Sequence, residues 1–154
     1  MNKIAPLILS CLFILGPLLA TSLQAGQKTL AERLGHPPDA KLLIIHADDL
    51  GLAHSVDAAS FAALEHKAAS SASVMVPCPW FAEVAAYARE HPDHDLGLHL
   101  THTSEWKTYR GGPVAPKDLV PGMLDPSGYL WPDVPDVAKH TKAEEIEREI
   151  RAQV

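Results

Sequence analysis

The chain has 154 residues, with 13 Lys and Arg against 19 Asp and Glu, and its formal net charge is −6. Because hydrophobic residues make up 47% of it, we expect a packed core and not an intrinsically disordered chain. The acidic balance argues against nucleic-acid binding, which requires a basic face. At this length the expectation is a single domain, and the 13 prolines and nine glycines predict that it is rich in loops.

The first 25 residues have the pattern of a secretory signal peptide. Lys3 precedes an apolar run over residues 4–20, and small or polar residues follow as far as Ala25. Two prolines and the shortness of the run argue against a stable membrane span, so we expect cleavage after Ala25. The protein would then be secreted or periplasmic, with residues 26–154 as its folded domain.

Three short apolar runs then alternate with helical patterns. Strands are expected over residues 41–46, 72–76 and 95–101, and helices over residues 56–67 and 80–90. The continuous apolar run over 41–46 is typical of a strand buried on both faces. An order of strand, helix, strand, helix, strand at these spacings predicts a parallel sheet in an α/β protein.

The remainder of the chain predicts a long loop followed by one helix. Residues 102–140 are rich in Pro and Gly, and loops of this length usually form lids or binding segments. Thr141 and Glu144 have the spacing of a capping box. The helix that follows them carries a narrow apolar stripe of Ile146, Ile150 and Val154.

Two adjacent carboxylates, Asp48 and Asp49, follow the first predicted strand. Ligands of parallel α/β folds bind at the carboxyl ends of the strands. Adjacent side chains of an extended strand end point in opposite directions, so one carboxylate could coordinate a metal while the other accepts a proton. The alternative is a polar turn in which an Asp caps backbone groups.

His99 lies at the end of the third predicted strand. A neutral imidazole in that position is a ready ligand for a divalent metal, although a single histidine is more often structural or solvated. The loop that follows contains Trp106, Tyr109 and Arg110. These side chains could form a stacking and hydrogen-bonding platform for a sugar ring, or the aromatic residues could simply pin the loop to the domain.

Three segments, taken together, resemble a known family. Residues 43–52 (LIIHADDLGL) are similar to the opening signature of the YdjC-like carbohydrate deacetylases, which include chito-oligosaccharide deacetylases. Residues 70–76 (SSASVMV) and 97–101 (GLHLT) match the next two blocks of that family in order and spacing. The resemblance implies a distorted (β/α) barrel of the glycoside hydrolase/deacetylase type. It also implies metal-dependent hydrolysis of acetyl groups from N-acetylated oligosaccharides.

The resemblance assigns roles to three residues. By position in the motifs, Asp48 corresponds to the catalytic base, Asp49 to a metal ligand and His99 to the first of two histidine ligands. The mixture of oxygen and nitrogen ligands permits either Mg²⁺ or Zn²⁺. Trp106, Tyr109 and Arg110 remain candidates for binding the substrate.

The family pattern extends beyond the residues present in this chain. Members carry the second metal histidine in a His-rich segment after the position where this sequence stops, and a (β/α) barrel needs about 250 residues. We therefore expect the N-terminal part of a truncated barrel, with weak metal binding and little or no deacetylase activity. The alternative is a secreted, non-catalytic carbohydrate-binding or interaction module, or a pseudoenzyme. The sequence leaves the oligomeric state open, including a homo-oligomer.

Overall fold

A computed structural model describes residues 27–154, so the predicted signal peptide lies outside the described residues. The described chain divides into a segment that ends at Leu42 and a larger unit, Leu43–Val154. The first segment contains a short helix, α1 (Leu30–Arg33), which is closed by reciprocal hydrogen bonds between Thr29 and Glu32. Within the described residues, no helix is both long and apolar enough to cross a membrane.

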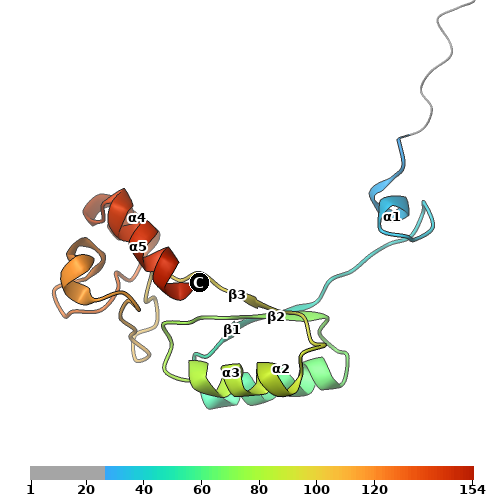
Figure 1. The fold of residues 1–154 in the computed structure, drawn as a ribbon, viewed down its shortest axis with the longest axis horizontal. Coiled ribbons are helices and arrows are strands. Elements are labelled where there is room, and N and C mark those ends of the chain that lie inside the picture. The colour runs from blue at the N-terminus through green and yellow to red at the C-terminus, as the bar shows by residue number, and fades with distance from the viewer. Residues whose placement is uncertain (1–26) are drawn as a thin grey trace, which may run out of the picture. The chain divides into compact units, whose positions relative to one another are not determined.

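The larger unit begins with a three-stranded parallel sheet. Its strands are β1 (His46–Leu50), β2 (Ser71–Val74) and β3 (Leu96–Leu98), and they lie in the order β1-β2-β3 (Figure 1). Helix α2 (His54–Glu65) joins β1 to β2, and helix α3 (Phe81–Glu90) joins β2 to β3. The predicted α/β class and parallel sheet are confirmed.

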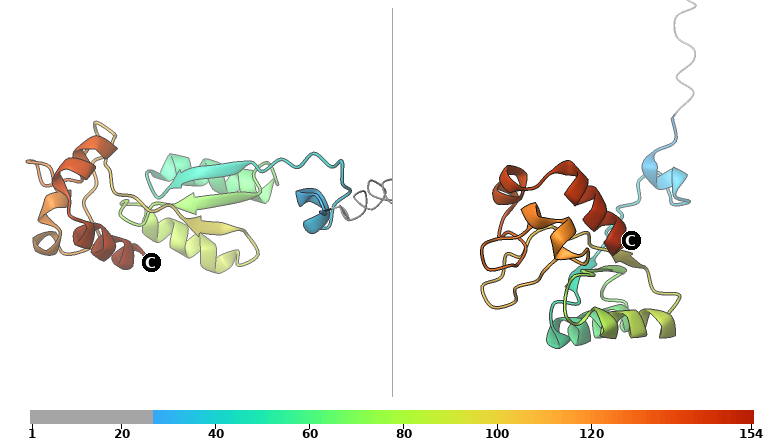
Figure 2. Two further views of the ribbon diagram at one scale, coloured as in Figure 1. Left: turned by 90° about the horizontal axis from the view of Figure 1, so that it is seen from above. Right: turned by 60° about the vertical axis from the view of Figure 1, so that its left-hand side comes forward.

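Both connecting helices pack against the same face of this sheet (Figures 1 and 2). Alternation along β2 turns Ala72 and Val74 toward the helices, and these residues join an apolar cluster completed by Leu50, Leu64, Ala69, Val84 and Tyr87. The opposite face of the sheet is polar, with Ser71 and Ser73 on β2. Consecutive strands with helices on one side are the arrangement found in (β/α) barrels.

The first strand lies further along the chain than predicted. Leu43 is 81% exposed and Ile44 is 77% exposed, so the expectation that residues 41–46 form a strand buried on both faces is wrong. The reason is that β1 lies at an edge of the described sheet, and its register with β2 begins only where His46 pairs with Ser71. The two carboxylates therefore lie inside the strand and not in a loop after it.

The Pro- and Gly-rich region is a second packed layer and not only a loop. It contains two 3₁₀ turns, η1 (Lys117–Leu119) and η2 (Pro121–Met123), and helix α4 (Val134–His140). Its buried residues form a second apolar cluster, made of Ala115, Val120, Met123 and Leu130, against which Ile146 packs.

Helix α5 (Ala143–Gln153) begins one residue later than the predicted capping box implies. The Lys142 N–H donates to the Glu145 carboxylate at 2.8 Å, so Glu145 and not Glu144 closes the first turn. Thr141 is instead used elsewhere, since its hydroxyl donates to the Gly122 carbonyl at 3.0 Å.

The buried face of α5 is polar. Its buried side chains are those of Glu145, Glu149 and Gln153, whereas Val154 is 84% exposed, so the apolar stripe does not form the main contact. Burial is tolerated because loop backbone groups satisfy these side chains. The two oxygens of Glu149 accept the N–H groups of Val114 and Ala115 at 2.9 and 2.8 Å.

Candidate metal and substrate site

An irregularity in β1 creates the site. Ala47 pairs with Ala72 and Leu50 pairs with Val74, so β1 has one more residue between these pairs than β2 has. The extra residue is accommodated by Asp49, whose φ of 62° lies in the left-handed region that Asp tolerates better than most residues. This bulge overturns the expectation that adjacent carboxylates point in opposite directions.

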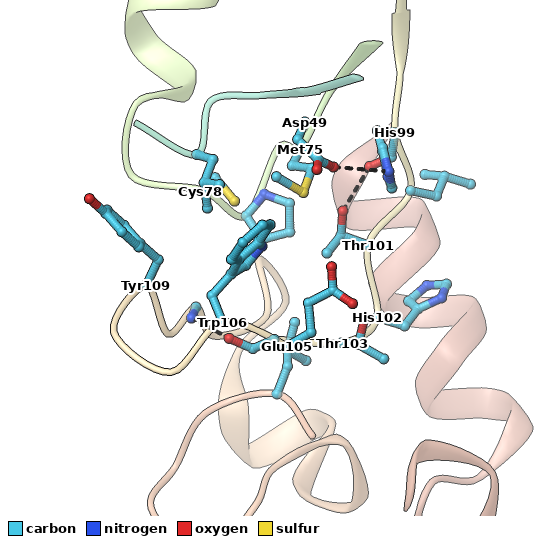
Figure 3. Close-up of a pocket in the computed structure, with 16 residues that line it drawn as sticks. Asp49, Met75, Cys78, His99, Thr101, His102, Thr103, Glu105, Trp106 and Tyr109 are labelled. Carbon is cyan, nitrogen blue, oxygen red and sulfur yellow. Dashed lines mark hydrogen bonds and ion pairs between the residues drawn. The ribbon is translucent and has the colours of Figure 1, made fainter. Parts of the chain in front are cut away.

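The carboxylates of β1 meet the imidazole that follows β3. His99 Nε2 lies 3.5 Å from Asp48 Oδ1 and 3.4 Å from Asp49 Oδ1. The three residues offer ligand atoms that all lie within 4.8 Å of one another. Figure 3 shows Asp49 and His99 facing each other at one end of the pocket. The parallel sheet therefore brings together three predicted site residues from two of its strand ends.

This donor set fits a divalent cation. Two carboxylate oxygens and one imidazole nitrogen are ligands that both Mg²⁺ and Zn²⁺ accept. The cluster is partly open, since Asp48 is exposed and Asp49 and His99 are half-buried. An open cluster of this kind leaves room for water and substrate beside the protein ligands.

Asp48 is held in its ionised form by its neighbours. Burial by itself would raise the pKa of Asp48, but the hydrogen bond from Ser73 and the nearby His99 imidazole lower that pKa below its usual value. The Ser73 hydroxyl donates to Asp48 Oδ1 at 2.8 Å. Asp48 is therefore a carboxylate near neutral pH and is able to accept a proton.

The cluster opens into a pocket of about 170 Å³. Asp49 and His99 line one end, Met75 and Cys78 belong to its wall, and the loop residues Trp106 and Tyr109 lie across from His99 (Figure 3). Burial raises the pKa of the Cys78 thiol to about 11, so this cysteine is an uncharged wall residue. The two aromatic side chains are exposed enough for a sugar ring to stack on them.

Arg110 bonds to other residues of the loop layer, whereas Trp106 and Tyr109 line the pocket. Its guanidinium donates to Asp125 at 2.7 Å and to the Leu130 carbonyl at 2.8 Å, and it lies over the Tyr129 ring at 5.4 Å. Arg110 is not among the residues that line the pocket. The structure brings Trp106 and Tyr109 to the pocket and gives Arg110 contacts within the loop layer.

Several supporting residues were not identified from the sequence. Ser73 contacts Asp48, and the fully buried Asp57 accepts the Gly51 N–H at 2.7 Å immediately after the bulge. Gly51 has a φ of 91°, and a Cβ there would lie 3.1 Å from the Met75 carbonyl. One signal was available for Ser73, because Ser71 and Ser73 alternate with apolar residues at the start of the strand predicted over residues 72–76 and so mark a polar face.

Comparisons with known proteins show the family of the chain. The family model described as YdjC-like protein matches residues 42–154. A carbohydrate deacetylase of Thermus thermophilus is 37% identical over 125 residues, covering 81% of this chain and 42% of the relative. A carbohydrate deacetylase of Enterococcus faecalis is 33% identical over 92 residues, covering 59% of this chain and 34% of the relative.

One solved structure has a similar fold. It is a crystal structure from Enterococcus faecalis V583, provisionally described as that of a cellobiose-phosphate cleavage protein, with a TM-score of 0.62 and 28% identity. The match covers 72% of this chain and 41% of that chain. The present chain thus spans about two fifths of the length of the relatives it matches. The resemblance seen in the three sequence segments is confirmed, and the chain belongs to the YdjC-like family.

Proposed function

We propose that the chain carries the catalytic base and two metal ligands of a carbohydrate deacetylase, which hydrolyses the amide bond of an N-acetylated sugar. The observation that carries this proposal is the convergence of Asp48, Asp49 and His99 within 4.8 Å, with Asp49 and His99 lining a pocket that also contains aromatic residues. The names of the relatives, carbohydrate deacetylases, support the same reaction class.

Asp49 and His99 would hold a divalent cation, either Mg²⁺ or Zn²⁺. When bound, such a cation lowers the pKa of a coordinated water and polarises a carbonyl oxygen. Asp48 would take the proton of the water that attacks the acetyl carbonyl carbon. That proton is then available to the sugar nitrogen as the C–N bond breaks, so that acetate and a free amino sugar leave.

Trp106 and Tyr109 would bind the sugar ring. Their exposed rings lie across the pocket from His99, so a sugar stacked on either ring could direct its acetamido group toward the carboxylates (Figure 3). Binding of an N-acetylated oligosaccharide should therefore quench tryptophan fluorescence, and Trp106→Ala should abolish the quenching.

The metal part of the proposal is tested by calorimetric titration of the full chain with Mg²⁺ and with Zn²⁺. We expect weak binding that is lost in Asp49→Asn and His99→Asn and unchanged in the control Asp118→Asn, which alters an exposed carboxylate on η1. Acetate release from an N-acetylated chito-oligosaccharide should be slow, and whatever release the wild type shows should require the added cation and be lost in Asp48→Asn. Equal metal binding by Asp49→Asn and Asp118→Asn would contradict the proposal.

A non-catalytic role is the second outcome of these experiments. The exposure of Trp106 and Tyr109 in the pocket favours sugar binding even without hydrolysis. Saturable fluorescence quenching by the oligosaccharide, without metal binding or acetate release, would support a carbohydrate-binding module instead of a deacetylase.

We also propose that the chain is exported, with residues 1–25 removed as a signal peptide. The support is the charged start, apolar middle and small-residue end of this segment. N-terminal sequencing of the protein recovered from a bacterial periplasm should begin at Gly26. An intact N-terminus on cytoplasmic protein would contradict export.

A further inference from the structure

We propose that His46 is a positioning residue for the base Asp48 and that it acts through Ser73. Three side-chain contacts form an unbroken line on the polar face of the sheet. His46 Nδ1 lies 2.7 Å from Ser71 Oγ, His46 Nε2 lies 2.9 Å from Ser73 Oγ, and Ser73 Oγ lies 2.8 Å from Asp48 Oδ1. This inference rests on the proposed function, because it takes Asp48 to be the base.

The number of available protons gives this line a direction. Ser73 has one hydroxyl proton, and the carboxylate of Asp48 can only accept, so that proton is donated to Asp48. Ser73 Oγ must then accept its second hydrogen bond from His46 Nε2–H. In a neutral ring Nδ1 is consequently the acceptor, and Ser71 donates to it.

The sheet itself creates this alignment. His46 and Ser71 are paired across β1 and β2, and residues two positions apart on a strand face the same side, which places Asp48 and Ser73 on that side as well. Ser73 is only 9% exposed, so its hydroxyl has few alternatives to these two partners. The line therefore depends on backbone pairing and not on a mobile loop.

The consequence concerns the orientation of Asp48. With Oδ1 held by Ser73, the carboxylate plane is restrained and the other oxygen is left to receive a proton. His46 is not among the residues that line the pocket. It reaches the site only through Ser73, so its contribution is to orient the base rather than to touch the substrate.

The hydrogen-bond direction can be measured without any enzyme activity. Long-range ¹H–¹⁵N correlation spectra of the full chain, recorded at a pH where the ring is neutral, should show His46 as the Nε2–H tautomer. Ser73→Ala should convert it to a mixture of tautomers. An Nδ1–H tautomer in the wild type, or a wild-type spectrum in Ser73→Ala, would overturn the proposal.

The effect on the base is measured by kinetics of cation-dependent acetate release. We expect His46→Ala to lower kcat about tenfold with little change in KM, because orientation and not sugar binding is lost. His46→Gln should recover most of the activity, since its amide N–H can donate toward Ser73. The control His66→Ala, which alters an exposed histidine, should match the wild type.

The outcomes separate the two proposals. Equal losses in His46→Ala and His46→Gln, with unchanged thermal unfolding, would refute a positioning role. If the wild type shows neither metal binding nor acetate release, the deacetylase proposal fails, while the tautomer measurement still decides whether His46 and Ser73 orient the Asp48 carboxylate.

Discussion

At the scale of single residues, the backbone at Asp49 is as important as its carboxylate. Asp49 has a φ of 62°, a conformation that Asn and Gly adopt easily and Ala does not. The bulge and the ligand are therefore combined in one residue. A variant that removes the ligand should be chosen so that it does not also strain the bulge.

This distinction predicts an order of stability among three variants. Asp49→Asn and Asp49→Gly should unfold at nearly the wild-type denaturant concentration, whereas Asp49→Ala should lose about 1–2 kcal/mol because Ala resists the left-handed conformation. All three variants should lose metal binding in calorimetry. Asp49→Ala proving as stable as Asp49→Gly would show that the bulge is not retained.

A second prediction at the scale of single residues concerns Asp57, whose pKa is raised where that of Asp48 is lowered. Its carboxylate is fully buried and accepts the Gly51 N–H. Burial and the neighbouring Glu83 carboxylate raise the pKa of Asp57, although the Gly51 hydrogen bond opposes the shift. The unfolded chain therefore loses this proton first, and the stability due to the group falls as pH rises from about 4, its ordinary value, through the folded pKa.

Asp57→Asn keeps an oxygen for the Gly51 N–H but carries no charge. Its free energy of unfolding should equal or exceed that of the wild type at pH 7, and this advantage should shrink at pH 4. Asp57→Ala is the matched comparison, because it leaves the Gly51 N–H unpaired and opens a cavity, at a cost of about 2–4 kcal/mol. Denaturant unfolding at both pH values measures these differences. If Asp57→Asn were less stable than the wild type at pH 7, the raised pKa of Asp57 would be contradicted.

At the scale of elements, local sequence patterns were sufficient to predict the order of the three strands and of the two helices between them. The position of β1 was not predictable in this way. Pairing with Ser71 begins at His46, and the bulge at Asp49 depends on that pairing and not on the local sequence. The sequence was enough to predict that the two carboxylates and His99 lie at strand ends. It was not enough to predict the bulge that brings both carboxylates close to the imidazole.

Helix α5 shows the same limit. Glu145, Glu149 and Gln153 are spaced four apart, so they lie on one face of a helix. From the sequence, a face of three polar residues is expected to point to solvent, but in the structure all three are buried. Their partners are loop backbone groups far away in sequence, such as Gly122, Ala115 and Thr101. A polar face becomes a packing face only when such partners are present, and the sequence does not pair them.

The contact between η2 and α5 gives a prediction for Gly122. A Cβ at this position would lie 2.6 Å from Glu145 Oε2 and 2.6 Å from the His140 carbonyl. Gly122→Ala should therefore separate the turn from the helix and cost about 1–3 kcal/mol by thermal or denaturant unfolding. The control Gly97→Ala, whose nearest contact would be 4.0 Å away, should change stability by less than about 0.5 kcal/mol. Similar losses in both variants would contradict this steric explanation.

At the scale of the whole larger unit, the site joins the sheet to the loop layer. The ligands come from β1 and from the residue after β3, whereas the aromatic side of the pocket comes from the loop that α5 supports. Two residues after His99, Thr101 is hydrogen-bonded to α5. Gln153 accepts the Thr101 N–H at 3.0 Å and donates to the Thr101 carbonyl at 2.7 Å.

This tether predicts that a residue far from the ligands in the sequence affects metal binding. Thr101 also donates from its hydroxyl to the His99 carbonyl at 2.9 Å, so loosening Thr101 should loosen the imidazole ligand. Gln153→Ala should speed hydrogen exchange at the Thr101 amide and weaken metal binding up to about tenfold, since residues that orient ligands commonly have effects of that size. Gln153→Glu should weaken metal binding at least as much as Gln153→Ala, because its carboxylate would face the Thr101 carbonyl and the buried Glu149 carboxylate, which both accept from the Gln153 amide in the wild type.

Arg151→Ala is the control on the same helix, because Arg151 is exposed and its ion pair with Glu147 stays within α5. It should leave both the exchange rate and the metal affinity unchanged. If Gln153→Ala weakened metal binding without faster exchange at Thr101, the effect would not pass through the tether. If neither quantity changed, His99 would be positioned by β3 alone, and the loop layer would contribute to the pocket only through its aromatic side chains.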